Sequence, residues 1–128
     1  MSSNGLTYDT GALVAAERDD RLMWSLHRAV LRRGLPPTVP AAALAEGWRG
    51  GPQANLSRLL KGCDIEDLTK ARARAVGALA ARTTHDDIVD VSVVEGAIRR
   101  NHAVVTSNSA HIHNVANATG VDIVIHSV

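Results

Sequence analysis

The chain has 128 residues, a single cysteine and a formal net charge of only +1. This length fits one domain over residues 1–128, while the composition excludes a disulfide framework, a thiolate metal cluster and a globally basic nucleic-acid binder. The apolar residues are mostly Ala, Val and Leu, with no Phe, so we expect an aliphatic, helix-rich core. We find no leader-like segment and no stretch long enough to span a bilayer, so we expect no membrane contact and a cytoplasmic location.

In the first half of the chain, short apolar runs alternate with longer helical stretches, which is typical of an α/β sheet with crossover helices. We predict strands at Leu6–Tyr8 and Thr38–Val39, and helices over residues 11–18, 19–33, 40–49 and 55–61. Pro40 is expected at the first helical position, where its missing N–H costs nothing. Gly50 and Gly51 are expected to end that helix.

The second half continues the pattern. We predict strands at Cys63–Ile65, Ala103–Thr106 and Val121–Ile125, and helices over residues 67–81, 86–100 and 109–118. Ligands of such sheets bind outside the carboxyl ends of the strands. Asp9 and Asn108 follow two strands, so we expect them at one rim, and the connecting helices can bring Glu46 and Asp90 to the same place.

Carboxylates that converge in this way need a cation. Two unit charges ~4 Å apart repel by roughly 4 kcal/mol at an effective dielectric near 20. An acidic cluster without a counter-ion therefore destabilises its own fold. The sequence predicts a divalent metal site, and with it phosphodiester chemistry.

Two of these acids have simpler structural interpretations. Asp9 can cap the helix that follows it. Glu46 follows an alanine-rich run, and we expect it on an apolar helix face, where a carboxylate needs a partner. Arg49, three residues further on, is a candidate partner.

Of the next two acids, Asp87 has a structural explanation and Asp90 does not. Thr84 followed by Asp87 has the form of a capping box, so Asp87 has a structural explanation without any chemistry. Asp90 is expected beyond the first turn, in register with Val94 and Ala97, where neither a cap nor the helix dipole explains it. Asn108 can be a helix cap as well as a site residue.

Histidines and basic residues give weaker signals. His111 and His113 are two residues apart on a predicted helix and do not share a face, so we do not expect a histidine metal site. The segment 21–61 holds seven Lys or Arg residues against Glu46 alone. These residues form either solvated helix faces or a surface for a polyanion.

Four segments taken in order resemble the PIN-domain family, and specifically the VapC-type toxins of VapBC toxin–antitoxin systems. They are residues 8–13 (Tyr-Asp-Thr-Gly-Ala-Leu), 45–51 (Ala-Glu-Gly-Trp-Arg-Gly-Gly), 87–90 (Asp-Ile-Val-Asp) and 104–108 (Val-Val-Thr-Ser-Asn). The resemblance implies a three-layer α/β/α sandwich with a mostly parallel sheet. It also implies an Mg²⁺- or Mn²⁺-dependent endoribonuclease that cuts tRNA or rRNA in a bacterial cytoplasm. A VapB-type antitoxin would neutralise it, and a homodimer is common in the family.

Site roles follow by position from the resemblance. Asp9, Glu46 and Asp90 are the implied catalytic acids, and Asp9, Asp90, Asp87 and Asn108 are the implied metal ligands. Thr10, Thr106 and Ser107 are accessory residues. Arg49, Arg58 and Lys61 are our predicted contacts to RNA phosphates.

The chain departs from the family pattern at Asn108, where many relatives carry Asp, and at His111, where some have a further acid. The site therefore has one negative charge fewer, which puts the second of two possible metal ions in doubt. This departure keeps open a rival function: a catalytically weak PIN-like module that binds RNA or a protein partner. Phosphatases of the haloacid-dehalogenase type are excluded, since Gly11 stands where their second Asp is needed.

Overall fold

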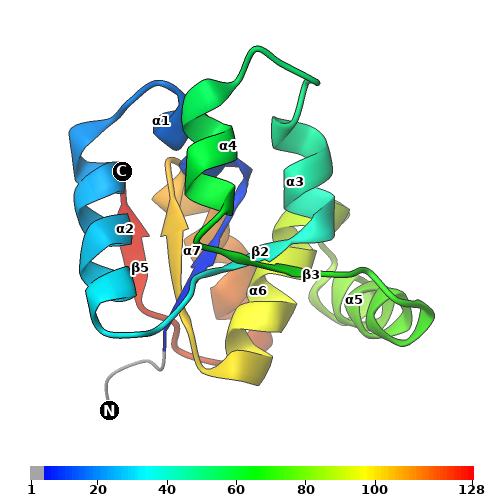
Figure 1. Ribbon diagram of the computed structural model, residues 1–128. Helices are drawn as coiled ribbons and strands as arrows, with labels where there is room; N and C mark the ends of the chain where they lie inside the picture. Colours follow the sequence, from blue (N-terminus) through cyan, green and yellow to red (C-terminus); the bar gives the residue numbers. More distant parts are fainter. Residues whose placement is uncertain (1–4) are drawn as a thin grey trace.

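Five short parallel strands form the middle layer of the protein, in the order β3-β2-β1-β4-β5 (Figure 1). The computed structural model describes residues 5–128. The strands are β1 (Leu6–Tyr8), β2 (Thr38–Pro40), β3 (Asp64–Glu66), β4 (Ala103–Thr106) and β5 (Ile125–Ser127). In chain order the sheet grows outward from β1 to β3 on one side, and β4 and β5 then add on the other side.

Helices cover both faces of this sheet (Figure 1). The first core joins the sheet to α1 (Thr10–Glu17), α2 (Arg21–Arg32) and α4 (Ala54–Leu60). The second joins it to α5 (Lys70–Thr83), α6 (Ile88–Arg100) and α7 (Ser109–Thr119). The short helix α3 (Ala41–Gly47) contacts both α1 and α6.

Strand alternation divides the two cores. Tyr8 and its register partner Val105 are fully buried in the core beneath α1 and α2, whereas Val104, the residue before Val105 in β4, belongs to the core beneath α6 and α7. Side chains of successive strand residues point to opposite faces, so a sheet covered on both sides needs continuous apolar strands. The predicted three-layer α/β/α sandwich is confirmed.

Most element boundaries differ from the sequence prediction by one to three residues. The predicted stop of the third helix at Gly50 and Gly51 is wrong, because α3 ends at Gly47. Two further differences concern Pro40 and the last strand. Pro40 ends β2 and is the N-cap of α3, not its first helical residue. The last strand is Ile125–Ser127, later than the predicted Val121–Ile125. Its pairing explains the shift, because Val104 to Thr106 of β4 lie opposite residues 125–127. Within residues 5–128, no helix has the length and apolar character needed to cross a membrane.

Gly11 fixes how closely α1 approaches the segment after β4. A methyl group at this position would meet the Ser107 hydroxyl and would lie 3.0 Å from both the Cβ and the backbone nitrogen of Ser107. The first turn of α1 therefore has no room for a larger side chain at residue 11. The start of α1 thus packs closely against the segment after β4.

Gly11→Ala should therefore destabilise the protein by about 1–3 kcal/mol, because overpacking forces a backbone shift. Urea unfolding of the variant measures the change. Gly77→Ala is the matched control, since Gly77 lies in α5 with open space around it, and alanine there should stabilise by about 0.5–1 kcal/mol. Equal effects of the two substitutions would contradict the close approach.

Candidate metal centre

Asp9 stands where the order of the strands reverses. β1 lies between β2 and β4, and the chain leaves it in both directions across the sheet. In sheets of this kind the ligand site lies at this switch point, beyond the carboxyl ends of the strands. The Asp9 amide continues the sheet by donating to the Val105 carbonyl at 3.2 Å. Asp9 therefore lies beside Thr106, the last residue of β4.

The Asp9 carboxyl is only 4% exposed. Its Oδ1 accepts a hydrogen bond from the Ala12 amide at 2.9 Å, so Asp9 does cap α1. Burial raises the pKa of Asp9, and the negative charge of Glu46 raises it further, while the Thr106 hydroxyl and two backbone amides act in the opposite direction. The cap interpretation is correct, but it leaves this carboxyl buried beside another acid.

Asp87 and Asp90 lie at the start of α6 and meet His111 from α7. The His111 Nε2 lies 2.7 Å from Asp90 Oδ2 and 3.7 Å from Asp87 Oδ2. One potential ligand atom from each of the three residues lies within 4.8 Å of the others. We call these three residues the Asp87–Asp90–His111 group. It can hold a metal ion.

Two sequence predictions are corrected here. Thr84 is the left-handed C-cap of α5 and does not begin α6. Asp87 is itself the N-cap, and its Oδ1 accepts a hydrogen bond from the Asp90 amide at 3.2 Å. Asp90 consequently lies in the first turn of α6, not beyond it.

Asp90 is held in a surrounding that disfavours its charge. The pKa of Asp90 is raised to about 6, mainly by burial. The charges of Asp87 and Asp9 also raise this pKa, while the His111 imidazole lowers it. Asp9 and Asp90 therefore interact electrostatically although they come from different elements. Repulsion from Asp87 and Asp9 thus adds to the effect of burial on Asp90.

Glu46 reaches the same edge from α3. Its Oε1 accepts a hydrogen bond from the Thr10 hydroxyl at 2.7 Å. The expected apolar face is wrong, because Ala45 and Glu46 are both exposed. The Arg49 guanidinium does not pair with Glu46 but donates to the carbonyl oxygens of Ala45 and Trp48.

The segment after β4 shapes the other side of the site. The Thr106 hydroxyl is fully buried and accepts a hydrogen bond from the backbone N–H of Asn108 at 2.9 Å. Asn108 is the N-cap of α7, where its Oδ1 accepts from the His111 amide at 3.3 Å. Ser107 is exposed and packs against Gly11. Capping therefore occupies the Asn108 amide oxygen.

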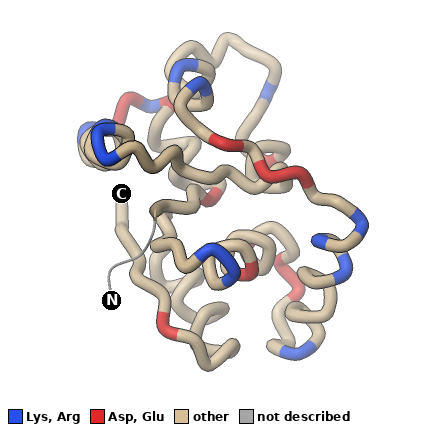
Figure 2. The backbone as a smooth tube through the Cα atoms, turned by 60° about the horizontal axis from the view of Figure 1, so that its bottom comes forward, with Lys and Arg blue, Asp and Glu red and all other residues tan. Residues whose placement is uncertain are grey.

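Two of the three predicted RNA contacts, Arg58 and Lys61, lie at the end of α4, and the third, Arg49, follows α3. Arg58 on α4 stacks over Trp24 with its guanidinium carbon 4.3 Å from the ring centre. Lys61 is the exposed C-cap of α4, and Arg49 follows α3. Figure 2 shows Lys and Arg on several separate elements, so charge alone does not outline a single binding face.

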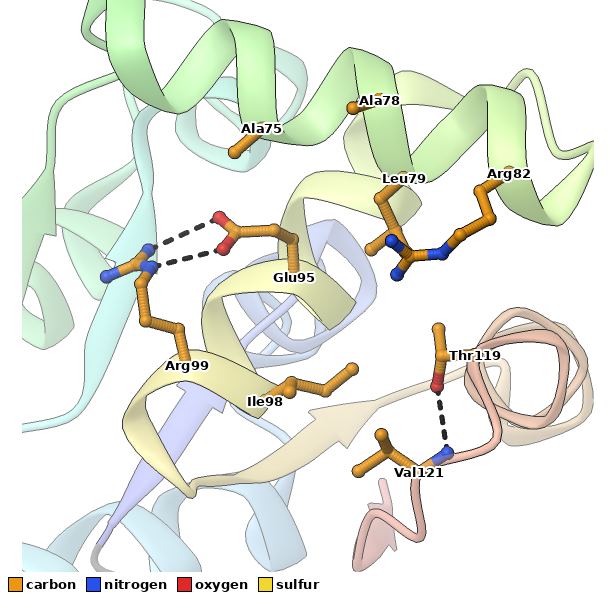
Figure 3. A pocket seen from close by; sticks show the side chains of 9 residues that line it. All are labelled: Ala75, Ala78, Leu79, Arg82, Glu95, Ile98, Arg99, Thr119 and Val121. Atoms are coloured by element: carbon orange, nitrogen blue, oxygen red, sulfur yellow. Dashed lines mark hydrogen bonds and ion pairs between the residues drawn. The ribbon is translucent and has the colours of Figure 1, made fainter.

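A cavity of about 370 Å³ lies elsewhere, between α5, α6 and the end of α7 (Figure 3). Ala75, Leu79 and Ile98 give it an apolar wall, and the Glu95 carboxylate in it is paired with Arg99. None of the predicted site residues lines it. The acids at the switch point remain the stronger candidate, because their charges are not neutralised by Lys or Arg in the described ion pairs.

His111 is the residue that sequence reasoning missed. The helical spacing predicted that His111 and His113 lie on different faces of one helix. This prediction is correct, since His113 is exposed on another side of α7. The signal that could have found it is its position three residues after Asn108. A residue in the first turn of α7 faces the same edge of the sheet as the end of β4.

No protein-family model matches the sequence, and no curated protein matches it. The order of the strands and the two helical layers define a fold class, the PIN-like α/β/α sandwich. The chain is similar to a chain in the crystal structure of VapBC2 from Rickettsia felis bound to a DNA fragment from their promoter. The TM-score is 0.65 at 16% identity, over 97% of this chain and 98% of that chain. The likeness confirms the fold expected from the sequence resemblance.

The raised pKa of Asp90 makes stability depend on pH. The folded protein binds this proton more tightly than the unfolded chain does, so the contribution of Asp90 to stability falls as pH rises from about 4 to about 6. In EDTA at pH 7.5, Asp90→Asn should be more stable than wild type by about 1–2 kcal/mol, and the gain should vanish near pH 4. Urea unfolding at the two pH values checks this. Asp122→Asn, at an exposed position, should show no such pH-dependent gain, and an Asp90→Asn effect independent of pH would refute the assignment.

Proposed function

We propose that the protein is a VapC-type toxin of the PIN-domain family, a metal-dependent endoribonuclease that a VapB-type antitoxin neutralises. The observation that supports the proposal is a buried Asp9 at the strand-order reversal, whose pKa is raised by burial and by the charge of Glu46 and whose own charge raises the pKa of Asp90. The similarity to a chain of the Rickettsia felis VapBC2 structure supports it. The proposed substrate is cellular RNA of the tRNA or rRNA class, cut in the cytoplasm.

The residues present fit Mg²⁺ or Mn²⁺. Both ions favour carboxylate, carbonyl and water oxygens. Asp9 and Asp90 would hold one ion, with Asp87 beside them at the start of α6. Asn108 contributes no charge and its amide oxygen already caps α7, so one ion fits the residues better than two.

A bound divalent ion would polarise the scissile phosphate and stabilise the charge on the departing oxygen. The protein residues supply position and proton transfer. Asp9 is fixed by the Ala12 amide and by its burial, so it gives a rigid anchor. Glu46 Oε1 is held by the Thr10 hydroxyl, which leaves Oε2 to orient a water molecule and take its proton. The expected products carry a 5′-phosphate and a 3′-hydroxyl.

RNA recognition would use single-stranded segments that can enter the open edge of the sheet. We propose backbone phosphate contacts from Arg49, Arg58 and Lys61. Arg58 and Lys61 lie on the α4 side of the structure, and the Arg58 guanidinium is also stacked on Trp24.

The proposed partners are a VapB-type antitoxin and a second copy of the chain. The Rickettsia felis complex was crystallised on a DNA fragment from its own promoter. By analogy, we propose that this chain joins an antitoxin complex whose antitoxin contacts operator DNA. The antitoxin would cover the acidic edge and so block the RNA site.

The nuclease is tested by incubating the protein with pooled structured RNA in Mn²⁺ or Mg²⁺ and in EDTA. We expect metal-dependent cuts that leave 5′-phosphates, and a loss of about 100-fold or more in Asp9→Asn and Asp90→Asn, because charge stabilisation by one group is commonly worth this much. Sequencing of the 5′ ends gives the cleavage sites.

Asp122→Asn is the matched control, since it removes an exposed carboxylate outside the site. It should cleave like wild type. Absence of cleavage by folded protein that still binds the metal would favour the rival function, a PIN-like module that binds RNA or protein. Cleavage that survives EDTA and both site substitutions would refute the acidic mechanism.

A further inference from the structure

The imidazole of His111 is built into the acidic edge. His111 lies in the first turn of α7, and its backbone amide is capped by Asn108 Oδ1. Asp87 and Asp90 lie at the start of α6, which packs against α7. The three side chains therefore come from two helix starts with fixed backbone positions.

We propose that His111 is a nitrogen ligand of the metal centre and makes it select a transition-metal dication that binds imidazole well, such as Co²⁺ or Zn²⁺, over Mg²⁺. This inference deepens the proposed function and rests on the same site. It concerns which ion the site takes, and it can be tested without measuring RNA cleavage.

The donor spacing fits a shared ion. Two ligand atoms at right angles on an ion with bonds of about 2.1 Å lie about 3 Å apart. His111 Nε2 lies 2.7 Å from Asp90 Oδ2 and 3.7 Å from Asp87 Oδ2, on either side of that value. One ligand atom from each of the three residues lies within 4.8 Å of the others, and the histidine side chain has room to adjust to an ion because it is 39% exposed.

The donor chemistry separates the candidate ions. Mg²⁺ demands octahedral oxygen coordination and keeps its water, whereas imidazole nitrogen suits transition ions. This chain has an uncharged amide at Asn108 and an imidazole at His111, so the edge offers less negative charge and a softer donor. Both features weaken the site for Mg²⁺ and favour ions that bind nitrogen.

The test uses Co²⁺ alone as the probe, titrated into full-length protein freed of metal by a chelator. Calorimetry gives the affinity, and visible absorption of bound Co²⁺ reports on nitrogen ligation. His111→Ala should lower Co²⁺ affinity by about 10- to 100-fold, and Mg²⁺ affinity by less than about threefold because Mg²⁺ favours oxygen donors. His111→Asp should reverse the preference towards Mg²⁺.

His113→Ala is the matched control, because His113 is an exposed histidine on the same helix. It should bind Co²⁺ like wild type, and circular dichroism should show that every variant is folded. Unchanged Co²⁺ affinity in His111→Ala, or no Co²⁺ binding by folded wild type, would overturn the inference and leave only an Asp–His ion pair.

The two proposals fail separately. His111-dependent Co²⁺ binding in a protein that cuts no RNA would uphold the ligand and refute the nuclease. Metal-dependent cleavage with the same Co²⁺ affinity in wild type and His111→Ala would uphold the nuclease and overturn the ligand.

Discussion

Repulsion between carboxylates at one edge of the sheet is the constraint on which the site depends. Asp9 is almost fully buried, and burial together with the charges of Asp87 and Asp9 raises the pKa of Asp90 to about 6. A protein under selection for stability alone would replace one of these acids, since a neutral residue removes both burial cost and repulsion. The proposed cation would offset this repulsion and so explain their presence together.

Strand pairing, close packing and helix capping hold these acids in place. β1 and β4 pair in register, so Asp9 and Thr106 follow adjacent strand ends. Gly11 lets α1 approach Ser107, and the caps by Asp87 and Asn108 fix the starts of α6 and α7. The same side chains thus serve as helix caps and as neighbours of the site. A capping role and a metal role are compatible, because a carboxylate has two oxygens.

Much of this arrangement could be predicted from the sequence. The buried runs at Leu6–Tyr8 and Ala103–Thr106 identify two central strands, and the residues after them must share an edge in a parallel sheet. Positions set by tertiary contact could not be predicted. The last strand is set by pairing with β4, and Glu46 is exposed because α3 turns its alanine face elsewhere. His111 was missed because its partners are on another helix, and helical spacing says nothing about them.

The most direct test of the central claim is the thermal stability of the metal-free protein before and after addition of Mn²⁺. An ion at 100 times its Kd stabilises the folded state by about 2.7 kcal/mol, which raises Tm by several degrees in a domain of this size. We predict this rise for wild type and its loss in Asp9→Asn, whose own metal-free Tm should equal or exceed that of wild type. No rise in wild type, or the same rise in Asp9→Asn, would contradict a metal centre at the strand-order reversal.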